Sequence, residues 1–199
     1  LMCGIVGIYN FKNRNPVSVN LIECMLRSIN HRGPDERGVY LNNNLGLGNV
    51  RLSILDLSTG QQPICDESGN FWIVFNGEIF NYIELKLELE KKGARLKTRS
   101  DTEVIAVAYS IWGIGFIEKL NGQFAFAIWD KREHELLLVR DRVGICPLFY
   151  TEINGSVIFG SEIKAILQNP DVRPELSLTS LCQIFTYWST LSPATLFNN

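Results

Sequence analysis

Cys3 stands almost at the start of the chain, and a thiol becomes a nucleophile when a base takes its proton. The sequence holds two candidate imidazole bases, His31 and His134. His134 lies in a charged turn and is expected to be solvated. His31 lies in a tight Gly-Pro loop, where a structural role is favoured over a role as base.

The α-amino group is a second candidate base, provided that Cys3 is itself the first residue. A free α-amine has a pKa of about 7.7–8, so part of it is neutral at neutral pH. It would also be held on the same residue as the thiol. Position alone equally allows Cys3 to be a small apolar residue of a terminal strand, and this alternative stays open.

Asn76 and Gly77 follow an apolar stretch at residues 71–75. An Asn side chain and the next backbone N–H are two neutral donors that can point at one spot, as an oxyanion requires. Asn-Gly is also a common tight-turn dipeptide, so the pair alone is a weak signal.

Arg51 and Asp101 could hold a charged ligand from two sides. Arg51 sits between apolar residues, where it is either a surface residue or a carboxylate clamp. Asp101 is either a helix-start residue or a partner for an ammonium group. One acid and one base of this kind would hold an α-amino acid by both its ends.

Alternating and helical periodicities predict the elements that must position these side chains. We expect helices at residues 16–29, 81–92, 162–168 and 176–187, and a further helix after the capping-box spacing at Ser100–Glu103. We expect strands at residues 4–9, 38–41, 45–54, 71–75, 123–129, 135–140, 148–151 and 156–160. Several hairpins without regular βαβ alternation favour a mostly antiparallel α+β layered domain.

Composition excludes several classes of protein. The chain has 199 residues, a formal net charge of −2, 46% hydrophobic and 20% charged residues, and its charges are interspersed. We therefore expect a globular domain that binds neither nucleic acid nor membrane. The longest stretch without a charged or strongly polar group, residues 104–117, is too short to span a bilayer, and the amino terminus does not resemble a signal peptide. Five widely spaced cysteines without a CxxC pair predict neither a zinc site nor a disulfide framework, and so favour a reducing cytoplasm.

Eight motifs in register give the chain a family resemblance. They are Met2–Ile8, His31–Asp35, Arg51–Ile54, Asn76–Asn81, Ser100–Glu103, Leu120–Phe126, Arg140–Gly144 and Ser161–Ala165. Together they resemble the glutaminase domain of class II glutamine amidotransferases, closest to the glutamine-hydrolysing asparagine synthetases. The resemblance covers residues 2 to about 168.

The resemblance implies a four-layer αββα sandwich of two antiparallel sheets, of the N-terminal-nucleophile hydrolase type. It implies that Cys3 attacks the side-chain amide of L-glutamine and that Asn76 and Gly77 form the oxyanion hole. Arg51 would bind the substrate carboxylate, and Asp101 with Glu78 would bind its α-amino group. The segment Leu52, Ser53, Ile54 and Leu55 would line the pocket, and no metal is implied in this domain.

The resemblance also implies a longer protein. Residues 1–2 are interpreted as a cloning remnant and an initiator Met, residues 3–168 as the glutaminase domain, and residues 169–199 as a linker and the start of a truncated synthetase domain. ATP and Mg²⁺ are expected only in that synthetase domain, which would use the ammonia to amidate an acceptor carboxylate, aspartate by default. Whether the chain forms a homodimer stays open.

Departures from the family pattern are expected to lie outside the implied glutamine site. Asn49 and Val50 stand where many relatives have a His, Cys146 precedes Pro147 where Lys is common, and Gln123 replaces a usual Met. Two alternative functions are also considered. Another terminal-nucleophile hydrolase, acting on a linear amide such as an acylated amine, would have no use for an α-amino acid clamp. A non-catalytic remnant would have no reason to keep all the residues of the implied site, namely Cys3, Arg51, Asn76, Gly77 and Asp101.

Overall fold

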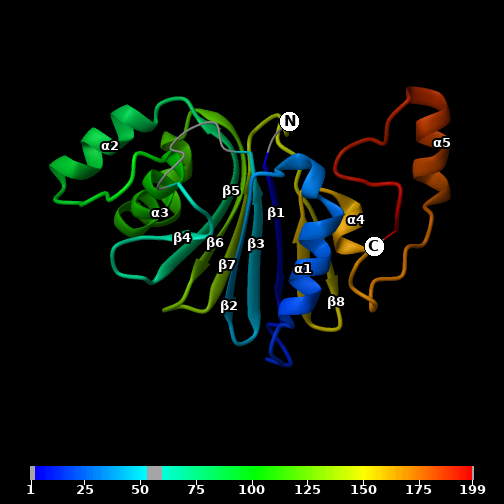
Figure 1. The fold of residues 1–199 in the computed structure, drawn as a ribbon. Helices are drawn as coiled ribbons and strands as arrows, with labels where there is room; N and C mark the ends of the chain where they lie inside the picture. The colour runs from blue at the N-terminus through cyan, green and yellow to red at the C-terminus, as the bar shows by residue number, and fades with distance from the viewer. Residues whose placement is uncertain (1–2, 53–59, 199) are drawn as a thin grey trace.

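The computed structural model describes residues 3–52 and 60–198, and its described strands form two antiparallel sheets (Figure 1). The first sheet has the strand order β2-β3-β1-β9-β8 and the second has the order β4-β5-β6-β7. The strands are β1 (Gly4–Tyr9), β2 (Glu36–Asn42), β3 (Leu45–Arg51), β4 (Ile64–Cys65), β5 (Phe71–Ile79), β6 (Gly122–Asp130), β7 (Glu135–Arg140), β8 (Phe149–Ile153) and β9 (Ser156–Gly160).

Helices cover the outer face of each sheet, as Figure 1 shows. On the four-stranded sheet lie α2 (Tyr82–Lys91) and α3 (Asp101–Trp112), and on the five-stranded sheet lie α1 (Val19–Ser28) and α4 (Ile163–Ile166). Short 3₁₀ helices η1 (Asn30–Arg32) and η2 (Gly113–Lys119) follow α1 and α3. The expected αββα sandwich is confirmed.

Strand β6 shows how the sequence pattern builds these layers. Phe124, Phe126 and Ile128 pack in the cluster beneath α2 and α3. Ala125, Ala127 and Trp129, which alternate with them, pack in the cluster between the two sheets. Because side chains alternate across a strand, one stretch of sequence supplies both cores.

The structure differs from the sequence prediction mainly around β5. The expected strand at residues 71–75 continues to Ile79, so Asn76 and Gly77 lie within a strand and not in a turn. All nine residues of β5 pair with β6, and this ladder overrides the local turn preference. The short strand β4 and the helix η2 were not predicted, and the helix expected at 162–168 is reduced to Ile163–Ile166.

Beyond α4, helix α5 (Leu178–Tyr187) lies to the side of the sandwich in Figure 1. Its C-terminal end carries exposed aromatic side chains, Phe185 and Trp188 among them. Within residues 3–52 and 60–198, none of the helices has the length and apolar character needed to cross a membrane.

Candidate active site

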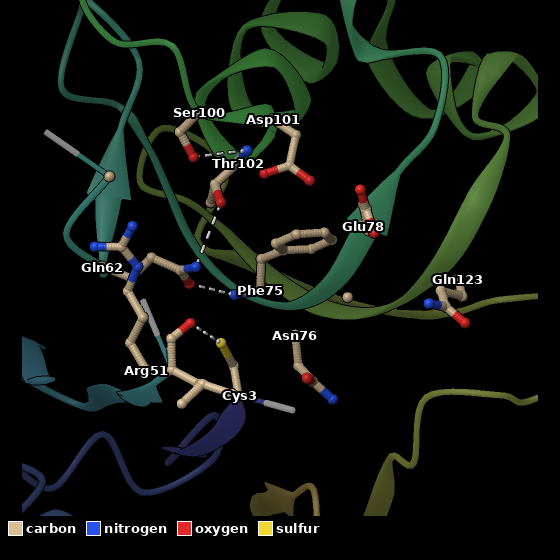
Figure 2. A pocket seen from close by; sticks show the side chains of 13 residues that line it. Cys3, Arg51, Gln62, Phe75, Asn76, Glu78, Ser100, Asp101, Thr102 and Gln123 are labelled. Atoms are coloured by element: carbon tan, nitrogen blue, oxygen red, sulfur yellow. Dashed lines mark hydrogen bonds between the residues drawn. The ribbon is translucent and has the colours of Figure 1, made fainter. Parts of the chain in front are cut away.

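A cavity of about 280 Å³ opens where the two sheets and the start of α3 meet. It brings together Cys3, Arg51, Leu52, Asn76, Gly77, Glu78 and Asp101, which the sequence singles out. Its wall also includes Gly60, Gln62, Phe75, Ser100, Thr102 and Gln123 (Figure 2). Gln123 therefore borders the cavity, and the expectation that every departure from the family pattern lies outside the site is wrong at this position. Ser53, Ile54 and Leu55, which the resemblance also implicates, lie outside the described residues.

Cys3 immediately precedes β1, the middle strand of the five-stranded sheet. Its thiol faces the carbonyl oxygen of Leu52 at 3.8 Å, and its own carbonyl oxygen accepts a hydrogen bond from Arg32 Nε at 3.0 Å. Burial raises the pKa of the Cys3 thiol, and the positive charge of Arg51 only partly opposes this effect. The thiol is therefore protonated at neutral pH and needs a base to act as a nucleophile.

Neither histidine lines the described cavity wall. His31 Nε2 lies 2.9 Å from Glu162 Oε1, and its side chain is 55% exposed. His134 is exposed, and its carbonyl oxygen accepts a hydrogen bond from the Tyr9 hydroxyl. Both positions fit the structural or solvated roles that the sequence favours for these residues.

Asn76 is fully buried in β5, yet neither atom of its side-chain amide has a hydrogen-bond partner within the described part of the chain. Leaving a buried polar group unpaired costs about 1–3 kcal/mol, so such a group calls for an explanation other than stability. A ligand in the cavity that Asn76 lines would supply the missing partner.

Gly77 adopts φ +144°, a backbone conformation that side-chain-bearing residues rarely adopt. A Cβ at this position would lie 2.1 Å from the carbonyl oxygen of Gln123 on β6. Glycine is therefore required by the close approach of β5 to β6 beside the cavity.

Arg51 ends β3 and is 5% exposed, so it is not a surface residue. Its Nη1 atom lies 2.9 Å from Glu36 Oε2 on the neighbouring strand β2. A guanidinium group has five N–H donors in a fixed planar arrangement that matches the geometry of a carboxylate. Arg51 gives the cavity a positive end.

Asp101 and Glu78 give the cavity a negative side, which Figure 2 shows away from Arg51. Asp101 is the first residue of α3, and its Oδ2 accepts a hydrogen bond from the backbone N–H of Ile79 at 3.1 Å. Burial raises the pKa of the Asp101 carboxyl, and the charge of Glu78 adds to the rise. A cation placed between them would favour the ionised carboxylates, so the pair is suited to an ammonium group.

Gln62 is the wall residue that sequence reasoning missed most completely. It lies in a loop between Gly60 and Pro63 without hydrophobic periodicity. Ser100 and Thr102, by contrast, belong to the capping motif that the sequence does reveal. The Ser100 Oγ accepts the backbone N–H of Thr102 at 3.2 Å, as expected of an N-cap residue.

Comparison with known proteins places this site in a family. Residues 2–199 match the family described as "Glutamine amidotransferase domain". The chain is 43% identical to asparagine synthetase [glutamine-hydrolyzing] 1 of Bacillus subtilis over 98% of its length, and 38% identical to asparagine synthetase [glutamine-hydrolyzing] 3 of the same organism, also over 98%. The chain belongs to the glutamine amidotransferase family.

The chain spans about a third of those two relatives, 31% and 32% of their respective lengths. It is also 38% identical over 90% of its length to amidase chry2 of Gibberella zeae, of which it covers 28%. Among solved structures, it resembles the glutamine phosphoribosylpyrophosphate amidotransferase of B. subtilis with a TM-score of 0.70 and 22% identity. That match covers 88% of this chain and 45% of that chain, and it shows a shared fold.

Proposed function

We propose that this chain hydrolyses L-glutamine to L-glutamate and ammonia, with Cys3 as the nucleophile. One observation carries the proposal. A single cavity holds a thiol, a buried amide without a hydrogen-bond partner among the described residues, and opposite charges on Arg51 and on Asp101 with Glu78. Those groups match the amide, the carboxylate and the ammonium of glutamine.

In the proposed complex, Arg51 binds the α-carboxylate, while Asp101 and Glu78 bind the α-ammonium. Leu52 lines the pocket, together with Ser53, Ile54 and Leu55 as the family resemblance implies. The side-chain amide of the substrate then lies between the Cys3 thiol and the amide of Asn76. Holding both charged ends of the substrate orients the amide for attack.

The proposed reaction has two stages. The α-amine of a chain that begins at Cys3 takes the thiol proton, and the sulfur attacks the amide carbon. Asn76 Nδ2 and the Gly77 N–H donate to the resulting oxyanion. The C–N bond breaks as the amine returns its proton to the departing nitrogen, which leaves ammonia and a thioester. Water then gives a proton to the amine and attacks the thioester carbon, the C–S bond breaks, and glutamate and the protonated thiol result.

We further propose that the ammonia serves ATP-dependent amidation of an acceptor carboxylate, aspartate by default, in a synthetase domain of a longer protein. The names and greater lengths of the Bacillus relatives support this assignment. ATP and Mg²⁺ would act in that domain, and no cofactor enters the hydrolytic steps proposed for Cys3. A cytoplasmic location is proposed on the five cysteines, all of which are free thiols.

The test is a glutaminase assay on a chain that begins at Cys3. Glutamate and ammonia should form in equal amounts from L-glutamine, and Cys3→Ala should abolish both, because no other group in the cavity can form the thioester. Cys146→Ala is the matched control, since this buried thiol lies in the core between the sheets and not in the cavity wall. Turnover that survives Cys3→Ala would overturn the proposal.

The two charged ends of the cavity make a separate prediction. Arg51→Ala should lower kcat/KM for glutamine about 10- to 150-fold, because it removes a charge-assisted pair that contributes about 1.5–3 kcal/mol. Asp101→Asn should lower it by a similar factor through the ammonium. Arg95→Ala, at an exposed position, is the control and should leave the rate unchanged. Hydrolysis by Arg51→Ala at the unaltered rate would contradict the assignment of the carboxylate.

A further inference from the structure

Gln62 connects two elements of the site through its side chain. Its Oε1 accepts a hydrogen bond from the backbone N–H of Phe75 at 2.7 Å, and its Nε2 donates to the Thr102 hydroxyl at 3.3 Å (Figure 2). Phe75 immediately precedes Asn76 on β5, and Thr102 immediately follows Asp101 on α3. One amide therefore joins the neighbours of the proposed oxyanion donor and of the proposed ammonium ligand.

The strand register explains why a side chain fills this place. Strand β4 pairs Cys65 with Trp72 and Ile64 with Ile73, so a continued ladder would set Gln62 opposite Phe75. Pro63 intervenes, and β4 begins only at Ile64. The ladder ends there, and the Gln62 side chain takes the place of a strand partner for Phe75.

The backbone of Gln62 is itself held against the other sheet. A Cβ on Gly38 of β2 would lie 1.8 Å from the Gln62 carbonyl oxygen, so the two backbones are in direct contact. Asp101 already links α3 to β5 through Ile79. Gln62 adds a second polar link at another point, beside the apolar packing of α3 on the sheet.

We propose that Gln62 is a positioning residue for glutamine hydrolysis, an inference that rests on the function proposed above. Through Phe75 it holds the strand that carries Asn76, and through Thr102 it holds the helix start that carries Asp101. The two halves of its amide therefore serve different parts of the substrate. The acceptor half supports the reacting carbonyl, and the donor half supports recognition of the α-ammonium.

The roles of the two halves of the Gln62 amide can be tested separately with 4-carbamoylbutanoate, a substrate that lacks the α-amino group. Thr102→Val removes the acceptor on α3 and should lower kcat/KM for glutamine about 2- to 12-fold, the range for one neutral hydrogen bond. The same variant should hydrolyse 4-carbamoylbutanoate at the unmodified rate. Thr102→Ser keeps the hydroxyl and should restore glutamine hydrolysis. Gln62→Met loses both links and should lower kcat for both substrates.

Matched controls are available away from the cavity. Thr151→Val changes another buried threonine, on β8 of the other sheet, and Gln168→Met changes a glutamine whose side chain bonds to Lys164. Neither should change the ratio of the two substrates, and thermal unfolding of every variant checks the fold. Equal losses on both substrates in Thr102→Val, or full activity of Gln62→Met, would overturn the inference.

Binding distinguishes a failure of this inference from a failure of the proposed function. Calorimetric titration of Cys3→Ala with glutamine or with 4-carbamoylbutanoate measures a Kd without turnover. If the chain that begins at Cys3 releases no glutamate, the proposed function fails. In that case a glutamine Kd weakened about 2- to 12-fold by Thr102→Val, with that for 4-carbamoylbutanoate unchanged, would still support the role of Gln62. No change in either Kd, or no binding of glutamine, would overturn it.

Discussion

A chain that begins at Cys3 should hydrolyse glutamine about 10²–10⁴ times faster than the chain that retains Leu1 and Met2, the range for loss of one general base. In the printed sequence two residues precede Cys3, so its nitrogen belongs to a peptide bond. An amide nitrogen is not basic at neutral pH and cannot take the thiol proton. The structure sharpens this expectation because burial raises the pKa of the thiol, which makes a base necessary.

The measurement is glutamate release by both chains, after intact mass has established which residue comes first. His31→Gln in the chain that begins at Cys3 is the control, and it should leave the rate unchanged, since His31 pairs with Glu162 and lies outside the cavity wall. Equal rates for the two chains would refute the terminal-amine mechanism. They would return His31 to consideration as the base.

The layered fold could be predicted from the sequence because its strands carry their pattern locally. The alternation of aromatic and small residues along β6 assigns one face to the helices and the other to the space between the sheets. The apolar periodicity of residues 17–29 likewise places α1, although the helix begins at Val19, after Pro16. Such signals need no knowledge of the partner that each face will meet.

The geometry around β5 could not be predicted in this way. Asn-Gly favours a turn, and only pairing with the distant strand β6 keeps Asn76 and Gly77 extended. Gln62 could not be identified from the sequence for a related reason, since its hydrogen-bond partners Phe75 and Thr102 are 13 and 40 residues away in the chain. The residue types alone indicate the chemistry of Cys3, Arg51 and Asp101. How the cavity wall positions these residues depends on contacts between distant parts of the chain.

Asn76→Ala should lower kcat about 10²–10³-fold, the effect of removing one oxyanion donor. KM should change little, because Arg51 and Asp101, which are proposed to bind the charged ends of glutamine, remain. The donor that remains, the Gly77 N–H, accounts for the residual rate. Steady-state kinetics with L-glutamine measure both constants.

The effect of Asn76→Ala on the stability of the fold also tells whether the Asn76 amide serves catalysis or supports the structure. The Asn76 amide is buried and has no hydrogen-bond partner in the part of the chain that the structure describes. Removing an unpaired buried polar group regains about 1–3 kcal/mol, which offsets the packing lost with the side chain, so Asn76→Ala should not lower the free energy of unfolding. Asn49 is the matched control, because its equally buried amide donates to the carbonyl oxygens of Gly4 and Phe75. Asn49→Ala should destabilise the fold, since both carbonyl groups lose a donor. Denaturant unfolding of the two variants decides the matter: if Asn76→Ala is the more destabilised of the pair and keeps its kcat, the amide of Asn76 supports the fold and not the oxyanion.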